Sequence, residues 1–186
     1  FNNWNRTSHP MKAVGNGNWE IEIPGVRTLK HRGKVKVAVT SPRGTEDRIP
    51  LYATYVVQDE KTHNFSAAIW NPRKEFVWTD EKFRPKKNVP PLIYEAHVGM
   101  ATEEERVGTY LEFMRDILPR IKKDGYNTVQ LMAIMEHPYY ASFGYQVSNF
   151  FAASSWYGTP DDLKALINEA HALGLSVLLD LVHSHA

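Results

Sequence analysis

Three apolar runs separated by two amphipathic segments occupy residues 92–186, and this order restricts the fold more than any other feature of the sequence. The runs span residues 92–98, 128–134 and 175–182. The middle run is almost continuously apolar, which is typical of a parallel strand covered on both faces. Strands joined through helices pair in parallel with right-handed crossovers. The pattern predicts an α/β fold and fits a doubly wound sheet and a (β/α)8 barrel equally well.

Both segments between these runs carry helix signals. In the first, Thr102 and Glu105 have the spacing of a capping box, and Pro119 is expected to kink or split the helix late. In the second, Thr159 is the expected N-cap, with Pro160 in the first turn. The apolar residues on one face are Val107, Tyr110, Leu111, Met114, Ile117, Leu118 and Ile121 in the first helix, and Leu163, Leu166, Ile167, Ala170 and Leu173 in the second.

The residues before position 80 follow a different pattern, with short alternating segments and frequent turns. Turn residues at 15–18 predict a hairpin that leads into a strand at 19–23. Further strands are expected at 34–39, 52–57 and 65–70. An antiparallel β-sandwich is the natural interpretation. The expected domains are the sandwich at 1–83, a Pro- and Lys-rich linker at 84–91, and the α/β domain at 92–186.

Composition excludes several classes of function. Lysine and arginine number 22 against 21 aspartate and glutamate, so the formal net charge of +1 provides no field that would attract a nucleic acid. No apolar run approaches the ~18 residues that span a bilayer. The chain contains no cysteine, which rules out disulfides and thiol chemistry. A neutral substrate suits this balance.

Polar and titratable residues gather where the three apolar runs end. The three clusters are residues 95–97, 135–140 and 180–185. In either parallel architecture these positions lie at the carboxyl ends of strands, where function collects. The aromatic loop at 139–151 follows the second run, and aromatic faces with nearby hydroxyl and amide groups suit a sugar. Tyr145 is the expected functional residue of this loop, whereas Phe143, Phe150 and Phe151 are expected to pack it onto the domain.

Three blocks of sequence resemble the eukaryotic-type 1,4-α-glucan branching enzymes of the α-amylase superfamily. They are Ile-Tyr-Glu-Ala-His-Val-Gly-Met at 93–100, the segment 125–151, and Asp-Leu-Val-His-Ser-His-Ala at 180–186. Residues 1–5 resemble a strand of the carbohydrate-binding module in that family. The resemblance implies a multidomain β plus α/β chain. Its parts would be an immunoglobulin-like β-sandwich module without its first residues, then the first three β/α units of a (β/α)8 TIM barrel.

The resemblance also implies a reaction and three substrate-binding residues. A retaining mechanism cleaves an α-1,4 bond and forms an α-1,6 branch, using two carboxyl groups roughly 5 Å apart. Tyr145 corresponds to the tyrosine that stacks under the sugar ring, Asp180 to the aspartate that organises the site, and His185 to a histidine that binds a sugar hydroxyl. The nucleophile and the acid/base are expected after Ala186, so this fragment holds no catalytic residue and is expected to be inactive alone.

Further expectations follow from the same resemblance. The partner is an α-glucan, with no nucleic acid, membrane, metal or cofactor, and the location is the cytoplasm, or the plastid for a plant protein. Trp156 departs from the family pattern, which has arginine before the Tyr-Gly-Thr-Pro turn at 157–160. Trp4 and Trp19 are interpreted as core residues of the sandwich.

Three alternatives stay open. His183 and His185 have the spacing of a metal-binding pair, with Asp180 or His97 as further ligands, as in a metal-dependent hydrolase. A glucan hydrolase or a debranching enzyme of the same superfamily would share much of this sequence. The chain alone would also serve as a non-catalytic glucan-binding fragment.

Overall fold

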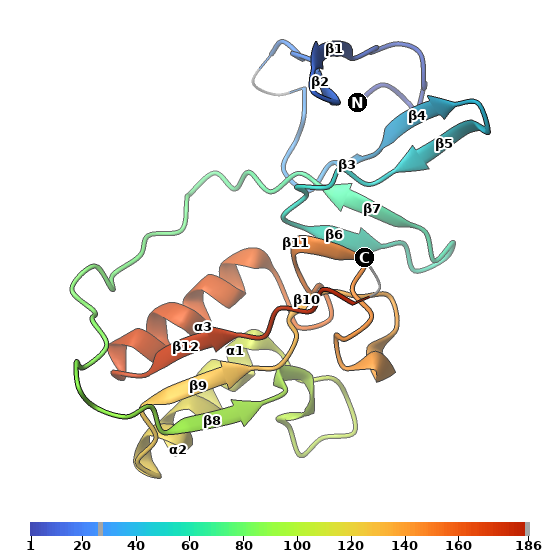
Figure 1. Cartoon of the computed structure of the whole chain (residues 1–186). Coiled ribbons are helices and arrows are strands. Elements are labelled where there is room, and N and C mark those ends of the chain that lie inside the picture. Colours follow the sequence, from blue (N-terminus) through green and yellow to red (C-terminus); the bar gives the residue numbers. More distant parts are fainter. Residues whose placement is uncertain (26–27, 185–186) are drawn as a thin grey trace.

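The computed structural model describes residues 1–25 and 28–184. Short antiparallel strands form the N-terminal β region, and the α/β region that follows contains a three-stranded parallel sheet, its helices and one further antiparallel strand pair (Figure 1). Within the described residues, no helix is long and apolar enough to cross a membrane.

The N-terminal strands pair in three small sheets. The predicted hairpin is confirmed, because β1 pairs with β2 through a turn in which Asn16 and Gly17 both have positive φ. β4 pairs with β5, and β7 lies between β3 and β6. The strands are β1 (Lys12–Gly15), β2 (Asn18–Glu20), β3 (Lys34–Val35), β4 (Val37–Ser41), β5 (Gly44–Arg48), β6 (Val56–Gln58) and β7 (Phe65–Ala68).

These small sheets do not share a buried core within the described residues. Antiparallel pairing was predicted correctly, but no side chain described between positions 1 and 54 is buried, and the first buried residue is Val56. The core assignment of two tryptophans was wrong, since Trp4 is 59% and Trp19 is 63% exposed. Trp19 lies on a hairpin whose two strands pair only with each other, and such a ladder has no facing layer to cover a ring.

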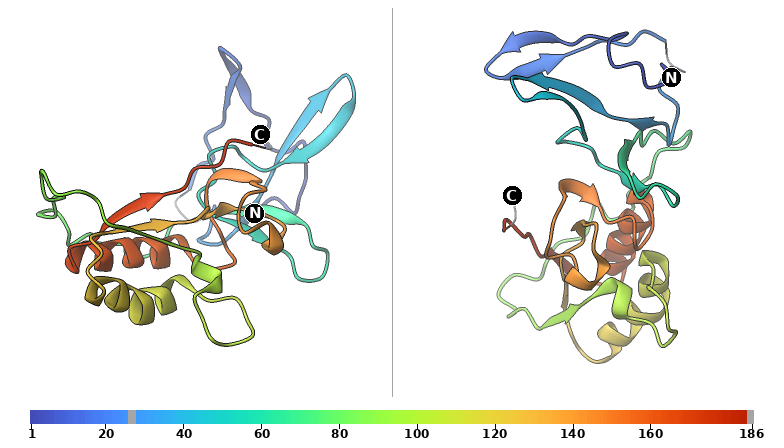
Figure 2. Two further views of the ribbon diagram at one scale, coloured as in Figure 1. Left: turned by 60° about the horizontal axis from the view of Figure 1, so that its bottom comes forward. Right: turned by 90° about the vertical axis from the view of Figure 1, so that its right-hand side faces the viewer.

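The α/β region contains the three predicted parallel strands. β8 (Ile93–Ala96), β9 (Thr128–Leu131) and β12 (Ser176–Leu179) form a sheet in the order β12-β9-β8. Their first residues lie in register, which brings the three carboxyl ends to one edge. The helices cover one face of this sheet (Figure 2). They are α1 (Tyr110–Glu112), the π-helical η2 (Phe113–Ile117), α2 (Leu118–Lys123) and α3 (Pro160–Ala172).

The hydrophobic core lies between the sheet and its helices. It joins Val129 and Leu131 of β9 to buried residues of the helices and of the segment before α3. Its buried members are Val98, Tyr110, Phe113, Leu118, Ile121, Val129, Leu131, Ile134, Tyr157, Leu166, Ala170 and Leu175. On the opposite face Gln130 donates to the exposed Glu95, at 3.1 Å, so β9 is covered by helices on one face only.

The first helix begins later than its sequence suggested. The capping box is formed by Thr109 and Glu112, whose side chains accept each other's backbone N–H groups at 3.2 and 3.0 Å. The predicted pair Thr102 and Glu105 instead lies in the loop before the helix, so that assignment was wrong. Pro119 lies in the first turn of α2, directly after η2, and the backbone stays helical from Tyr110 to Lys123, so the helix is widened before the proline and is not split. Proline has no N–H to donate, and the widened turn accommodates this.

The start of α3 agrees with its prediction. Thr159 accepts a hydrogen bond from the Asp162 N–H at 3.2 Å, and Asp162 accepts one from the Thr159 N–H at 2.9 Å. Pro160 occupies the first turn, and Leu166 and Ala170 of the predicted face are buried. A helix with both ends and its apolar face specified locally needs little from distant parts of the chain.

A segment without regular structure, residues 70–83, runs along α3 from its first turn to its last. We call this segment the strap. The hydrogen bonds join Trp70 Nε1 to Asp161 Oδ1 (3.1 Å), Thr79 N to Asn168 Oδ1 (2.8 Å) and His171 Nδ1 to Asp80 Oδ2 (2.5 Å). The strap therefore connects the β region to the α/β region through polar contacts that the sequence did not indicate.

Replacing Asn168 with alanine is expected to loosen the strap. Asn168 accepts from Thr79 N and its amide donates to Thr79 Oγ1 at 2.9 Å, so alanine removes both contacts. The two contacts together are expected to contribute about 2 kcal/mol to holding the strap on α3, because each such bond contributes roughly 0.5–1.5 kcal/mol net. Limited trypsin digestion should cleave the variant faster at Lys74 and Lys82. The exposed neighbour Glu169, changed to alanine, is the matched control, and equal cleavage in both variants would contradict the expectation.

Candidate functional site

A hairpin and its loop lie over the carboxyl ends of the parallel strands. β10 (Met135–Glu136) follows β9 and pairs antiparallel with β11 (Asn149–Ala153), and the 3₁₀ turn η3 (Tyr140–Ser142) lies between them (Figure 1). The region expected to be one long loop is therefore partly a strand pair. We call residues 137–155 the hairpin loop. It brings Tyr145 to the end of β12.

Tyr145 and Asp180, two of the three predicted site residues, are in direct contact. The Tyr145 hydroxyl donates to Asp180 Oδ2 at 2.6 Å, and both side chains are half-buried. Asp180 is the first residue after β12, and its N–H still bonds to Leu131 O at 3.1 Å, which fixes its direction. His185, the third predicted residue, lies outside the described residues. The structure thus brings together residues that are 35 positions apart in the chain.

The proton in this contact belongs to the tyrosine. The hydrogen bond to Asp180, followed by burial and by the charges of Asp180 and Glu95, raises the pKa of Tyr145 to about 12. The phenol therefore stays protonated at neutral pH and donates to the carboxylate, which is a charge-assisted bond. The outcome is a fixed ring edge beside an oriented carboxylate, an arrangement that can hold a polar ring-shaped ligand.

Gly144 sets the position of Tyr145. Its φ of +89° lies in the left-handed region, and an added Cβ would lie 2.1 Å from the backbone oxygen of Ala133. No side chain fits in that space, so the loop can lie directly on the chain that follows β9. Tyr145 itself packs against the small cluster of Ala133, Met135, Val147 and Val182.

A buried glutamate lies at the base of the same loop. Glu136 and His137 are both fully buried. Glu136 Oε1 accepts from His137 N at 3.0 Å, and Oε2 accepts from Ser155 N at 2.8 Å. Burial raises the pKa of Glu136 to about 7, against the opposing effect of its hydrogen bonds to Ser155 and His137. Sequence reasoning included residues 135–140 as a cluster but gave Glu136 no role; its signal was a charge directly after an apolar run.

Residues 93–186 match the family model for the α-amylase catalytic domain. The chain belongs to the α-amylase family. Residues 1–53 match the model for carbohydrate-binding module 48, described as the isoamylase N-terminal domain.

Relatives across the whole chain are 1,4-α-glucan-branching enzymes. One from Rhizophagus irregularis is 52% identical and one from Solanum tuberosum 49% identical, each over 100% of this chain. The chain spans 28% and 22% of the lengths of these relatives. Among solved structures, a protein from Salmonella typhimurium assigned as an α-amylase is 25% identical, with a TM-score of 0.73 over 92% of this chain and 27% of that chain.

His97, a candidate metal ligand in the hydrolase alternative, is already engaged on both ring nitrogens. Nδ1 accepts from Met100 N at 3.1 Å, and Nε2 lies 3.2 Å from the Tyr157 hydroxyl. Burial, with a smaller contribution from His137, lowers the pKa of His97 and keeps the ring neutral. Within residues 1–25 and 28–184, no group of three or more His, Cys, Asp and Glu residues could hold a metal ion. His97 therefore stabilises the turn η1 (Val98–Met100) in this α-amylase-family chain.

Trp156 lies at the position where the resemblance led us to expect an arginine. Its indole N–H donates to His137 O at 2.9 Å, and its ring lies 5.5 Å from that of Tyr140. The tryptophan thus still supplies one donor to the hairpin loop but no charge.

The phenylalanines of the loop differ from one another. Phe150 packs as predicted, whereas Phe151 is 53% exposed and contacts Tyr52 of the β region, so its packing assignment was wrong.

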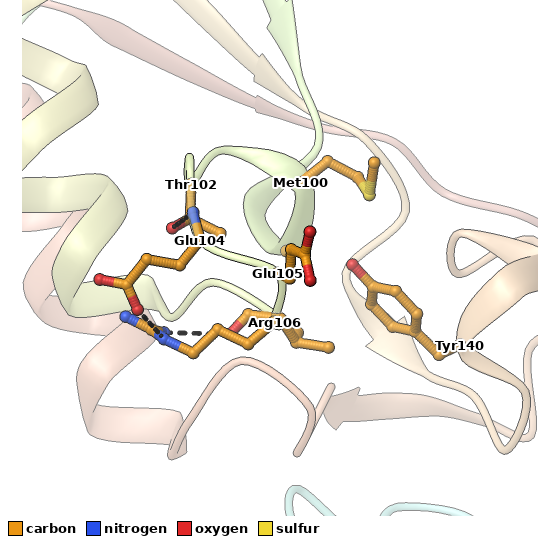
Figure 3. Close-up of a pocket in the computed structure, with 8 residues that line it drawn as sticks. Met100, Thr102, Glu104, Glu105, Arg106 and Tyr140 are labelled. Atoms are coloured by element: carbon orange, nitrogen blue, oxygen red, sulfur yellow. Dashed lines mark hydrogen bonds and ion pairs between the residues drawn. The ribbon is translucent and has the colours of Figure 1, made fainter.

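A separate hollow of about 340 Å³ lies beside the loop after β8. Figure 3 shows the Tyr140 hydroxyl pointing towards Glu105 across it, while Arg106 is turned to Glu104. The lining residues are Gly99, Met100, Thr102, Glu104, Glu105, Arg106, Val107 and Tyr140. Neither Tyr145 nor Asp180 contributes to it, so the hollow is distinct from the site formed by this pair.

Proposed function

We propose that this chain belongs to a 1,4-α-glucan branching enzyme, a glycosyltransferase that cleaves α-1,4 linkages and forms α-1,6 branches in glycogen or starch. The observation that carries the proposal is identity of about 50% across the whole chain to enzymes of that name from fungi, a slime mould and plants. Identity spread over the whole chain supports a shared reaction better than an isolated motif does.

The fold supports an assignment of separate roles to the parts of the chain. Residues 1–83 serve as a carbohydrate-binding module, residues 84–91 as a linker, and residues 92–186 as the first three β/α units of a (β/α)8 barrel. The in-register parallel strands, with helices on one face, support this assignment, because barrel strands turn their other face inward. The location is the cytoplasm, or the plastid in a plant, as the name of an Arabidopsis relative indicates for that protein.

The pair of Tyr145 and Asp180 supports a role in holding the sugar at the cleavage point. The ring of Tyr145 offers an apolar face to a pyranose, and Asp180 accepts from Tyr145 with one oxygen and keeps the other for a sugar hydroxyl. His185 contributes a further hydrogen bond to the same sugar. Two carboxyl groups from later residues, about 5 Å apart, supply the nucleophile and the acid/base of a retaining reaction.

A glucan hydrolase or debranching enzyme is the second candidate. It is favoured by the fold shared with a glycogen-degrading pneumococcal module, which is 18% identical with a TM-score of 0.65. Proton NMR of amylose after incubation separates the two reactions, because branching creates α-1,6 signals and hydrolysis creates reducing ends. The protein expressed from the complete gene is expected to form branches, and the 186-residue chain alone to form none. Reducing ends without branches would contradict the branching proposal.

Replacing Tyr145 with phenylalanine is expected to lower branching activity about tenfold. The ring is retained, but Asp180 loses a charge-assisted bond of 2.6 Å, and such bonds contribute roughly 1.5–3 kcal/mol. The assay is kcat/KM for amylose with the complete gene product. Tyr139→Phe is the matched control, because that loop tyrosine is 59% exposed and its hydroxyl makes no hydrogen bond within the described part of the chain. Equal activity of both variants would contradict the role given to Tyr145.

A further inference from the structure

The side chain of Glu136 joins the two ends of the hairpin loop. One carboxylate oxygen accepts from the N–H of His137, the first residue of the loop, at 3.0 Å. The other accepts from the N–H of Ser155, the last residue, at 2.8 Å. The side chain is fully buried, so water does not replace either bond when it breaks. A single carboxylate therefore holds together backbone groups 18 positions apart.

The backbone of Glu136 adds a third attachment at the middle of the loop. Its carbonyl oxygen accepts from Ser148 N at 2.9 Å and from Ser148 Oγ at 3.2 Å. Next to it, Ser154 N donates to Ile134 O at 2.8 Å. Tyr145 lies in the stretch that these attachments enclose. The direction of its hydroxyl towards Asp180 thus depends on a loop that is fixed at its base.

Both partners of this carboxylate are hydrogen-bond donors, so the side chain at position 136 has to offer two acceptors. An ionised carboxylate only accepts hydrogen bonds, whereas the glutamine side chain offers one accepting oxygen and one donating NH₂ group. Glutamine at position 136 would direct its NH₂ group at one of the two backbone N–H groups. Glu136 forms no ion pair within residues 1–25 and 28–184. Attraction to a neighbouring cation therefore does not explain why a carboxylate occupies this position.

We propose that Glu136 is a positioning residue, whose carboxylate closes the hairpin loop and thereby keeps Tyr145 in contact with Asp180. It does not touch the substrate, since its side chain is fully buried. The functional part of this inference rests on the proposed branching activity. The structural part, closure of the loop by Glu136, does not.

The test compares the variants Glu136→Gln and Glu136→Met with the unsubstituted protein at pH 8. The glutamine side chain keeps one of the two accepting oxygens and the methionine side chain keeps neither, while both are nearly as long as glutamate. Amide hydrogen exchange at residues 139–148 is expected to rise about tenfold in the glutamine variant and further in the methionine variant, since each lost bond exposes a buried donor. Thr128→Val is the matched control, because Thr128 is a buried polar residue at the opposite end of β9.

A second readout separates positioning from a general loss of stability. In the complete gene product, Glu136→Gln is expected to lower kcat/KM for amylose about tenfold, comparable to the effect of Tyr145→Phe. If Glu136 acts through Tyr145, the decrease in kcat/KM of the double variant, Glu136→Gln with Tyr145→Phe, is clearly smaller than the product of the two single decreases. If the two residues act independently, the two decreases multiply.

The outcomes distinguish the inference from the function on which it rests. Faster exchange confined to the hairpin loop, together with the non-additive double variant, supports the inference. Unchanged exchange at 139–148, or faster exchange spread over β9 and α3 as well, would overturn it. Local exchange as expected in a protein that makes no branches would support loop closure and refute only the proposed function.

Discussion

Gly144→Ala is expected to displace the hairpin loop and to lower the free energy of unfolding by at least ~3 kcal/mol. An alanine Cβ would lie 2.1 Å from the backbone oxygen of Ala133 and 2.9 Å from its carbonyl carbon. Backbone atoms cannot turn aside as a flexible side chain can, so either the loop or the chain after β9 must move. The left-handed φ of +89° adds roughly 1–2 kcal/mol of strain for any residue with a Cβ.

The activity of the Gly144 variant should fall further than that of Tyr145→Phe. Displacement of the loop by an ångström or more breaks the contact of Tyr145 with Asp180 and also moves the ring, and such misplacement costs about 100-fold. Gly125→Ala is a close control. Its φ is +90° and an added Cβ meets nothing within 4 Å, so it carries the backbone strain without the collision. Chemical unfolding and kcat/KM for amylose measure the two effects. If Gly144→Ala lowers the free energy of unfolding and kcat/KM no more than Gly125→Ala does, the loop does not need the close approach of Gly144 to the backbone of Ala133.

Local signals explain why the α/β region could be predicted from sequence. Each parallel strand is a short apolar run, and α3 has its capping residue, its first-turn proline and its apolar face within 15 positions of one another. Tyr145 and Asp180 were assigned from family motifs, and their contact of 2.6 Å agrees with a shared site. Their roles towards a sugar stay predictions.

Features that depend on distant partners were not predictable. Trp4 and Trp19 look like core residues by type, but Trp4 lies in an exposed turn, and the two-stranded sheet that carries Trp19 faces no second layer within the described residues. Thr102 and Glu105 have the spacing of a capping box, yet the later pair at Thr109 forms it. The strap and the buried carboxylate of Glu136 arise because polar groups remote in sequence meet in the fold. The periodicity of apolar residues along the chain does not predict such contacts.

The stability of this protein is expected to fall, relative to its Glu136→Gln variant, as pH rises from 5 to 8. Burial raises the pKa of Glu136 from 4.5 to about 7, so the folded state keeps this proton after the unfolded state has lost it. The stability that the folded form gains from this proton is therefore complete below pH 4.5, declines between pH 4.5 and 7, and is lost above about pH 7. A shift of this size corresponds to about 3 kcal/mol, at 1.36 kcal/mol per pKa unit.

The comparison with the variant is needed because two histidines act in the opposite direction. Burial lowers the pKa of both His97 and His137 below 6.5, so the unfolded state binds more protons there and stability rises with pH in the same range. These contributions are common to both proteins and cancel in the difference. The titratable groups whose pKa responds to Glu136 are Tyr55, Tyr110 and Tyr157, and all three keep their protons up to pH 8. His137 meets the Glu136 carboxylate through its backbone N–H, which does not titrate.

Urea unfolding at pH 5, 6, 7 and 8 provides the measurement. The difference in free energy of unfolding between the parent and Glu136→Gln should move by about 3 kcal/mol in favour of the variant across this range, with most of the change before pH 7. The variant begins at a disadvantage, because its NH₂ group faces a backbone donor at every pH. A difference independent of pH would mean that Glu136 is already ionised in the folded protein at pH 5. The two backbone N–H groups would then outweigh burial, and the carboxylate would close the hairpin loop over the whole physiological range.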